Sequence, residues 1–309
     1  MYKQLKVCII GDGIHSKRIQ KILKIYKVNF HIYKPDSKKD YKKKNLKELK
    51  KFNVFFIISP NHTHYHYIKS LYKNGYIFCE KPPTNNKSEL NKLKRINSKK
   101  IYYNFNFRFS RISQILKNRN KYNLGKLIYA NIISGKGLAF KPEYKKNRRS
   151  NIKLCPKGVF EMVTIHWLDL IYHLFNVTKI NKPQLTNLSK VGTSYDNSNI
   201  RVEIDKKIIA EIFCTYTSPL IDKKIFIFKN GIVEQNENVI SIKGPAINYD
   251  SNKFFKKPKT IKKINVSEKK DYQESLFKSV KFFLDITNNK KDFSKKENIQ
   301  SLNVNNMII

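Results

Sequence analysis

A glycine-containing loop joins the first apolar run of the chain, Leu5–Ile10, to the first amphipathic stretch, Ser16–Tyr26. A strand, a Gly-x-Gly loop and a helix in this order are typical of sites that bind the pyrophosphate of a dinucleotide, although an ordinary turn can also contain glycine. The first glycine permits the tight turn, the second lets the backbone approach the phosphates, and the helix N-terminus supplies N–H donors. Ser16 replaces the usual third glycine. We expect cofactor contacts from four residues: Gly11, Gly13, Ile14 and His15.

The end of the second apolar run, Asn29–Tyr33, bears on which dinucleotide is bound. An acidic residue commonly binds the ribose 2′-hydroxyl at this point, but Lys34 stands there and the nearest acid is Asp36. A cation suits the 2′-phosphate of NADP, so we expect NAD(P) with a mild preference for NADP. The alternative, that Lys34 only reflects a lysine-rich composition, has equal weight.

The segment Val54–Pro82 contains two apolar runs. The first run is followed by a turn that consists of a small residue, Pro and Asn, and then by a histidine. The second run is followed by Glu-Lys-Pro. With the upstream glycine loop, this combination resembles the Gfo/Idh/MocA family, the glucose–fructose oxidoreductase and inositol dehydrogenase group. Further along, Asn106–Phe109 looks like the sixth-strand segment of that family, Gly158–Leu174 like its substrate helix and Asp271–Thr287 like its late helix. The residues that carry the main resemblance are Ser59, Pro60, Asn61, His64, Gly75, Glu80, Lys81 and Pro82.

The resemblance implies where the cofactor and the reacting group of the substrate bind. Lys81 should lie beside the substrate and the nicotinamide, as a proton relay or a polarising group. Partial desolvation of a lysine there would lower its pKa toward working pH. Further cofactor contacts are implied for Ser59, Pro60, Asn61, His64 and Glu80.

The substrate helix of the family carries Asp four residues before a His, and often another Asp three residues after it. His166 and Asp169 match, which implies a general acid/base and a group that orients it or binds substrate hydroxyls. Met162 occupies the first Asp position. Glu161 precedes His166 by five residues, about 140° away on a regular α-helix, and could replace the missing carboxylate only if the helix began irregularly.

Other residues that could bind a metal do not form a convincing set. His62, His64 and His66 alternate, but on the helix expected there they diverge, and no carboxylate or thiolate lies nearby in the sequence. We expect no metal site. The cysteines are scattered without a CxxC pair and are expected to be buried.

The predicted function follows from the resemblance. It is an NAD(P)-dependent oxidoreductase that transfers hydride between the cofactor and a hydroxyl or keto group of a sugar, sugar derivative or polyol. A nucleotide-linked or surface-polysaccharide sugar fits this class, although no residue singles it out. The alternative is a catalytically idle family member that senses cofactor or sugar or acts structurally, since Met162 replaces a site carboxylate.

The elements that must position these residues fall into two groups. Up to about residue 120, short apolar runs alternate with amphipathic stretches, which predicts a Rossmann-type doubly wound parallel α/β sheet. Residues 121–309 contain longer strand-like runs, an Asn230-Gly231 hairpin signal and one helix, Val159–Phe175. They predict an α+β domain with a mostly antiparallel sheet, for substrate binding and oligomerisation. The family resemblance implies a homodimer or homotetramer.

The composition excludes other classes of function. The formal net charge is +40, but 55 Lys stand against only 8 Arg, and arginine is the preferred residue for reading bases and for bidentate phosphate contacts. We therefore expect no specific nucleic-acid partner. The longest apolar runs, such as Val54–Ile58, are too short to span a bilayer, and no signal peptide is recognisable, so we expect a soluble, cytoplasmic protein without a membrane partner.

Overall fold

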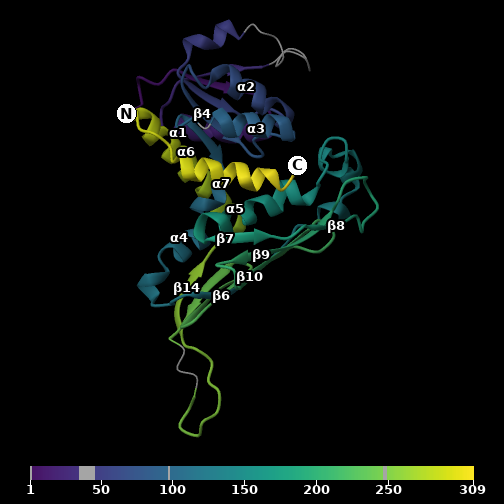
Figure 1. The fold of residues 1–309 in the computed structure, drawn as a ribbon, viewed down its shortest axis with the longest axis vertical. Coiled ribbons are helices and arrows are strands. Elements are labelled where there is room, and N and C mark those ends of the chain that lie inside the picture. The colour runs from purple at the N-terminus through teal and green to yellow at the C-terminus, as the bar shows by residue number, and fades with distance from the viewer. Residues whose placement is uncertain (1, 35–45, 97, 246–248) are drawn as a thin grey trace. The chain divides into compact units, whose positions relative to one another are not determined.

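The protein divides into two compact units in the computed structural model, which describes residues 2–34, 46–96, 98–245 and 249–309 (Figure 1). The first unit comprises Met1–Asn106 together with Leu276–Ile309, and the second comprises Phe107–Ser275. The sequence predicted a boundary after residue 120 and a second domain that continued to residue 309. The last residues return to the first unit because their helices pack against its sheet.

The first unit contains a five-stranded parallel sheet in the order β2-β1-β3-β4-β5. Its central strands are apolar along their whole length, as expected for strands covered on both faces, so the prediction of a parallel α/β sheet is confirmed. The strands are β1 (Val7–Ile10), β2 (Phe30–Tyr33), β3 (Val54–Ile57), β4 (Tyr76–Glu80) and β5 (Ile101–Asn104).

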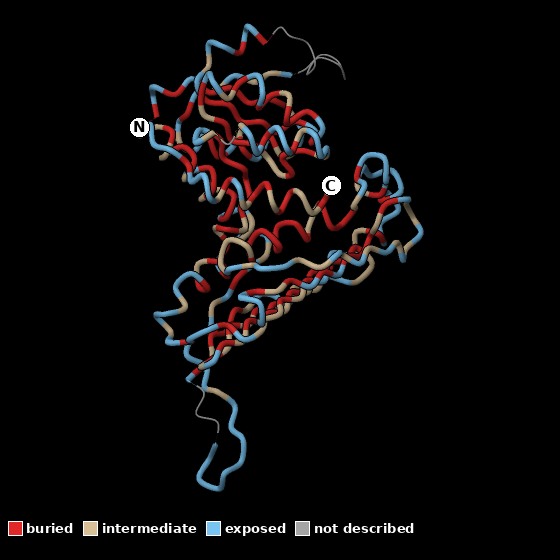
Figure 2. Tube along the Cα trace, in the orientation of Figure 1, coloured by how far each residue is buried: buried red, intermediate tan, exposed pale blue. Residues whose placement is uncertain are grey.

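Helices from both ends of the chain cover this sheet. Phe283 of α6 packs on Phe56 and Phe78, with ring centroids 5.1 and 5.4 Å apart, and Phe277 of α6 stacks on Tyr26 at the end of α1. Figure 2 shows that the strands and the inner sides of these helices are buried. The helices are α1 (Ile14–Ile25), α2 (His64–Leu71), α3 (Lys87–Ile96), α6 (Glu268–Asn288), which spans the unit boundary, and α7 (Lys295–Asn306).

The second unit contains a nine-stranded sheet in the order β14-β13-β12-β11-β6-β10-β9-β7, with β8 paired to β9. Only the β6–β10 pair is parallel among the described strand pairs, which confirms a mostly antiparallel sheet. The strands are β6 (Leu127–Gly135), β7 (Val177–Ile180), β8 (Gln184–Thr186), β9 (Asn197–Ile204), β10 (Ile208–Thr215), β11 (Ile221–Phe228), β12 (Gly231–Asn236), β13 (Val239–Lys243) and β14 (Thr260–Asn265). Helices α4 (Arg111–Lys117) and α5 (Ile165–Leu174) complete the unit.

Three local predictions differ from the structure. Asn106–Phe109 is a 3-10 helix rather than a strand, because the chain turns directly after β5. The hairpin between β11 and β12 forms, but its loop is Lys229-Asn230, since Phe228 already pairs with Gly231. The helix predicted from Val159 begins with a π-helical turn, Phe160–Thr164, before α5.

Within the described part of the chain, no helix combines the length and the apolar character needed to cross a membrane.

Candidate cofactor and catalytic site

The predicted cofactor residues follow successive strands of the parallel sheet. Gly11 comes directly after β1, Lys34 after β2, Ser59 after β3 and Lys81 after β4. Because all five strands are parallel, these residues lie along one edge of the sheet, where open α/β sheets bind ligands. Asn104, which the sequence analysis did not single out, ends β5 at the same edge.

The glycine loop has the geometry that a pyrophosphate requires. Gly11 has φ of +109°, its N–H donates to the Tyr33 carbonyl at 3.0 Å, and a Cβ there would lie 2.8 Å from the Ile58 carbonyl oxygen. A Cβ on Gly13 would meet no described atom within 4 Å. Gly13 is the N-cap of α1 and has no side chain that could cap the helix. The N–H groups of Ile14 and His15 therefore begin the helix beside open space, which suits a dinucleotide phosphate.

Ser16 supports this loop in place of a third glycine. Its side chain is fully buried, and its hydroxyl donates to the Gly11 carbonyl at 2.8 Å. Ser16 is a small residue, so the helix can pack closely on the strand.

Glu80 connects the glycine loop to the end of β5. One carboxylate oxygen lies 2.8 Å from Nε2 of His15 and accepts a hydrogen bond from the Asn104 amide at 2.6 Å. Burial alone would raise the pKa of Glu80, but His15, Asn104 and the neighbouring Lys81 together lower it, so the carboxylate is ionised at neutral pH. Asn104 in turn accepts a hydrogen bond from Ser279 of α6 at 2.7 Å. Glu80 thus positions His15 at the helix N-terminus.

His64 joins two of the loops at this edge. Its imidazole is fully buried, with Nδ1 2.9 Å from the Pro82 carbonyl and Nε2 2.8 Å from the Ser59 carbonyl. Burial lowers its pKa against the opposing effect of the two carbonyls, so the ring is neutral and donates from only one nitrogen at a time. His64 therefore positions the loops after β3 and β4, and a direct contact with the cofactor stays a prediction.

The loop after β3 is fixed by a second short contact. The hydroxyl of Ser59 lies 2.6 Å from that of Thr63, which also donates to the Pro60 carbonyl at 2.7 Å. Asn61 begins a 3-10 turn and is largely buried, whereas Pro60 is exposed. Ser59, Pro60 and Asn61 are thus held beside the glycine loop, since Ile58 donates to the Ile10 carbonyl at 2.9 Å.

Lys34 is paired with an acid that the sequence analysis did not consider. Its ammonium lies 2.6 Å from a carboxylate oxygen of Asp12, whose pKa is lowered by the hydrogen bonds from Lys34 and from Gln20. The end of β2 therefore has both a positive charge, on Lys34, and a negative charge, on Asp12, next to each other. Asp36, the nearest acid along the sequence, lies outside the described residues.

In the second unit, His166 lies near the start of α5 and is largely buried. Its ring stacks on Phe107 with centroids 4.5 Å apart and planes at 23°, and Phe107 also contacts Trp167 at 4.6 Å. The imidazole plane is therefore fixed by packing, which a general acid/base requires.

Asp169, three residues later, forms an ion pair with Arg108. Nε and Nη2 of Arg108 donate to the two carboxylate oxygens at 2.8 and 2.6 Å, and the exposed fractions of the two side chains are 5% and 0%. This bidentate pair gives Asp169 a structural role on the His166 face of α5, and its predicted roles in orienting His166 or binding substrate stay predictions.

Arg108 was missed by the sequence analysis although the sequence contains a signal for it. A planar guanidinium matches a carboxylate bidentately, whereas lysine does not, and a chain with 8 Arg among 63 basic residues uses arginine rarely.

The residues considered for metal binding do not converge. His66 lies 3.4 Å from Glu89, but nowhere in residues 2–34, 46–96, 98–245 and 249–309 do three His, Cys, Asp or Glu side chains form a group that could hold an ion. The four cysteines are buried free thiols, as predicted, and burial raises the pKa of Cys8 to about 12.

Comparisons with known proteins agree with this geometry. Residues 6–102 match the GFO_IDH_MocA family, described as an oxidoreductase family with an NAD-binding Rossmann fold. The match includes the glycine loop, Ser59–Asn61 and Glu80-Lys81. No curated protein matches the chain.

Solved structures of dehydrogenases share the fold along almost the whole chain. A levoglucosan dehydrogenase in complex with NADH and levoglucosan has a TM-score of 0.77 at 12% identity, over 98% of this chain and 95% of its own. The dehydrogenase MviM from Clostridium difficile has 0.71 at 18%, over 98% of both chains. A putative NADPH-dependent oxidoreductase from Desulfitobacterium hafniense has 0.77 at 13%, over 98% and 94%. At these identities the likeness shows the fold.

Proposed function

We propose that the protein transfers hydride between NAD(P) and a hydroxyl or keto carbon of a sugar, sugar derivative or polyol, because its residues 6–102 match the Gfo/Idh/MocA family of NAD-binding oxidoreductases. The observation that carries the proposal is the arrangement along the edge of the parallel sheet. The open helix N-terminus at Gly13, the His15–Glu80 pair and Lys81 follow neighbouring strands there.

The chain's own residues have separate tasks in the proposed reaction. When bound, the nicotinamide would accept the hydride, which is the substrate C–H hydrogen with its electron pair. The proton of the hydroxyl group on the same carbon must leave its oxygen as the C=O bond forms. We assign the removal of this proton to His166, with Lys81 polarising the substrate oxygen. In the reverse direction His166 returns the proton. Packing on Phe107 holds the imidazole for this transfer.

Two observations support the proposed substrate class: the names of solved structures with the same fold, and the polar side chains of the candidate site. The levoglucosan dehydrogenase with the same fold is named for an anhydrosugar, and a sugar offers hydroxyl groups to polar side chains. Assay of purified protein with NAD⁺ or NADP⁺ and a panel of sugars and polyols, followed by nicotinamide absorbance, tests this class. Cofactor binding without turnover of any substrate would favour the idle alternative instead.

The Lys81→Ala variant tests the assignment of the lysine. We expect turnover to fall by about 100-fold or more, because general acid–base and polarising groups contribute effects of this size, while the dissociation constant of the cofactor changes little. His64 and Glu80 continue to position the loop in this variant. Full activity of Lys81→Ala contradicts the assignment.

The choice between NAD and NADP is a separate proposal. Lys34 suits a 2′-phosphate, but Asp12, 2.6 Å from it, would repel that phosphate and accept a hydrogen bond from a 2′-hydroxyl. We propose that both cofactors bind, with Lys34 favouring NADP. The ratio of the dissociation constants of NADPH and NADH measures the preference, and tighter binding of NADH contradicts it.

We also propose that the protein is a homodimer, or a homotetramer built from such dimers, through one face of the nine-stranded sheet. Alternate residues of its central strands leave apolar side chains partly exposed, and Phe213 and Ile225 are 37% and 38% exposed. Tyr129 and Ile133 of the intervening strand β6 are half-buried. Partly exposed apolar side chains on a sheet face are suited to pairing with a second copy.

A further inference from the structure

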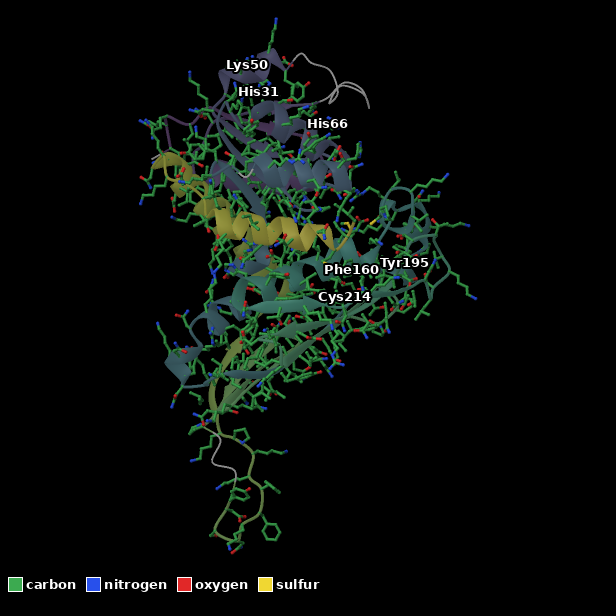
Figure 3. The ribbon with its side chains drawn as sticks, viewed as in Figure 1. His31, Lys50, His66, Phe160, Tyr195 and Cys214 are labelled. Carbon is green, nitrogen blue, oxygen red and sulfur yellow. The ribbon has the colours of Figure 1, made fainter. Side chains whose placement is uncertain are left out.

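An arginine contacts the turn that leads into the helix of His166. Nη2 of Arg148 lies 3.7 Å from the sulfur of Met162, which belongs to the π-helical turn before α5. Met162 precedes His166 by four residues, about one helical turn, so the two side chains project from the same side of the helix. Figure 3 shows Phe160 at the start of this helix. Arg148 therefore brings a guanidinium to the side of the helix that carries the imidazole.

The backbone that carries Arg148 is fixed by hydrogen bonds. Arg148 begins a 3-10 turn that ends at Ser150, and the side chain of Asn147 caps this turn. The Ser150 hydroxyl donates to the Asn147 carbonyl at 2.8 Å, and the Ser150 carbonyl accepts a hydrogen bond from the N–H of Thr193 at 2.7 Å. Because the segment is already ordered, a ligand that binds Arg148 loses little affinity to the ordering of this backbone.

The charges near Arg148 in the sequence are almost all positive. Residues 141–157 contain seven basic residues and one acid, Glu143, a larger excess than the 63 basic against 23 acidic residues of the whole chain. In the described part of the chain, no acid forms an ion pair with Arg148, and the thioether of Met162 cannot neutralise its charge. This surface therefore favours a negatively charged ligand over a neutral one.

The type of residue indicates which anions fit. Arg148 and Arg149 are adjacent in a chain that has 8 Arg and 55 Lys. A guanidinium binds a carboxylate or a phosphate through two parallel hydrogen bonds, whereas the ammonium of lysine acts as a point charge. The pair of Arg108 with Asp169 shows this bidentate geometry within the same unit. Arg148 itself is exposed, so its guanidinium is accessible to a ligand.

We propose that Arg148 binds an anionic group of the substrate, a carboxylate or a phosphate, and so selects acidic sugars over neutral ones. This inference rests on the proposed function, because His166 marks the position of the reacting carbon only if it transfers the proton. The acid group of the sugar then lies about one helical turn from the reacting carbon. Neutral Met162 permits this arrangement, since an acid in its place would repel the anionic group and pair with Arg148.

The side-chain Nε–H signal of Arg148 tests the binding without turnover. Protein labelled with ¹⁵N-arginine has few such signals because the chain contains 8 Arg, and an Arg148→Lys variant assigns the one from Arg148. With NADH present, the protein is titrated with glucuronate, glucose 6-phosphate, glucose and sodium chloride, the salts at equal ionic strength. We expect the signal to move with a sugar acid and not with glucose or sodium chloride. A signal that no sugar acid moves, or that sodium chloride moves as far, overturns the proposal.

The two sugar acids distinguish the two sources of the anionic group. Movement with glucuronate alone indicates a carboxylate, and movement with glucose 6-phosphate alone indicates a phosphate. For the acid that binds, we expect Arg148→Gln to raise the dissociation constant about tenfold or more, and Arg148→Lys to raise it less, because lysine retains the charge but not the two parallel hydrogen bonds.

Two control variants separate this contact from the general positive charge. Arg111→Gln removes an exposed arginine at the start of α4 in the same unit and should leave the dissociation constant unchanged. Met162→Asp should raise it about tenfold or more, because the new carboxylate competes for Arg148, whereas Met162→Leu should not. A loss of affinity in Arg111→Gln as large as that in Arg148→Gln contradicts a specific site.

Turnover distinguishes failure of this inference from failure of the proposed function. With an acidic substrate, we expect Arg148→Gln to raise KM while kcat changes little, since the contact binds a group remote from the reacting carbon. If a sugar acid moves the Arg148 signal but no sugar is oxidised or reduced, the proposed function fails and the anion site stands. If neutral sugars turn over and Arg148→Gln leaves kcat/KM unchanged for every substrate, the proposed function stands and this inference fails.

Discussion

The bidentate pair of Arg108 and Asp169 is the most deeply buried ion pair among the described residues of the second unit. Both side chains lose their hydration on folding, and their mutual attraction offsets this loss only while both are present. The pair fixes the 3-10 turn at Asn106–Phe109 to α5. Phe107, which stacks on His166, lies in that turn, so the pair indirectly positions the imidazole of His166.

Asp169→Asn therefore leaves a buried guanidinium without its counter-charge. We expect the free energy of unfolding to fall by about 3–5 kcal/mol. Urea unfolding followed by the fluorescence of Trp167, the single tryptophan, measures it in the second unit. The double variant Arg108→Met/Asp169→Leu removes both charges and should recover most of the loss. If Asp169→Asn is as stable as the wild type, the pair has no such structural role.

His173, one turn after Asp169, makes the second unit sensitive to acid. Burial, with Arg108 and Lys117 nearby, lowers its pKa to about 3. Between the ordinary histidine pKa near 6.5 and this value, the unfolded chain binds a proton that the folded protein does not, so stability is lost as the pH falls. We expect one histidine to contribute at most about 1.4 kcal/mol per pH unit over this range.

The His173→Gln variant isolates this effect. Its free energy of unfolding, measured by Trp167 fluorescence, should decrease less than that of the wild type from pH 6.5 toward pH 3, while the two pH dependences run parallel above pH 7.5. Equal slopes for the two proteins in the acid range would show that His173 is already protonated in the folded state.

The strand, loop and helix at β1–α1 act as one element in cofactor binding. Gly11 is required by its positive φ and the approach of the Ile58 carbonyl, whereas Gly13 is not required by any described neighbour. Substitution of Gly11 is therefore expected to affect the stability of the fold, and substitution of Gly13 to affect cofactor binding. A side chain at Gly13 would occupy only the space in front of the helix N-terminus.

Gly13→Ala tests this element. We expect its stability to fall by less than about 1 kcal/mol, the size of an N-cap change, while NADH affinity drops about tenfold or more because the methyl group meets the pyrophosphate. NADH fluorescence titration and thermal unfolding measure the two quantities. Gly11→Ala serves as the contrast, since strain there should destabilise the fold itself by about 1–3 kcal/mol. Unchanged NADH affinity of Gly13→Ala would place the phosphates elsewhere.

At the scale of the whole molecule, the net charge of +40 opposes association between copies. The charges are mainly exposed lysines, so their repulsion is screened by salt. The proposed sheet-face dimer should therefore strengthen as ionic strength rises, unlike the binding of a nucleic acid, which weakens with salt.

Ile225→Lys tests the interface by placing a charge in the centre of that face. We expect sedimentation equilibrium to show a smaller dimer fraction than in the wild type at equal concentration and salt. Leu188→Lys, at an apolar residue 66% exposed outside the sheet, is the matched control and should leave the dimer intact. A wild-type protein that remains monomeric at every ionic strength contradicts the proposed interface.

The sequence alone determined the elements whose signals are local. The loop Gly11–Ser16, the Ser59–Asn61 turn and Glu80-Lys81 are short motifs next to apolar strands, and strand ends in a parallel sheet necessarily meet at one edge. The place of these residues along one edge of the sheet could therefore be predicted residue by residue, and their roles in binding and catalysis stay predictions.

Only the tertiary structure decided the partners of these residues. Arg108 and Asp169 are 61 residues apart, and α6 and α7 return to the first sheet from the end of the chain. The π-helical turn before α5 lies between Gly158 and Thr164, which contact distant backbone and side chains. Such contacts leave no periodic pattern in the sequence, because each is set by packing between segments rather than by the conformational preference of the segment itself.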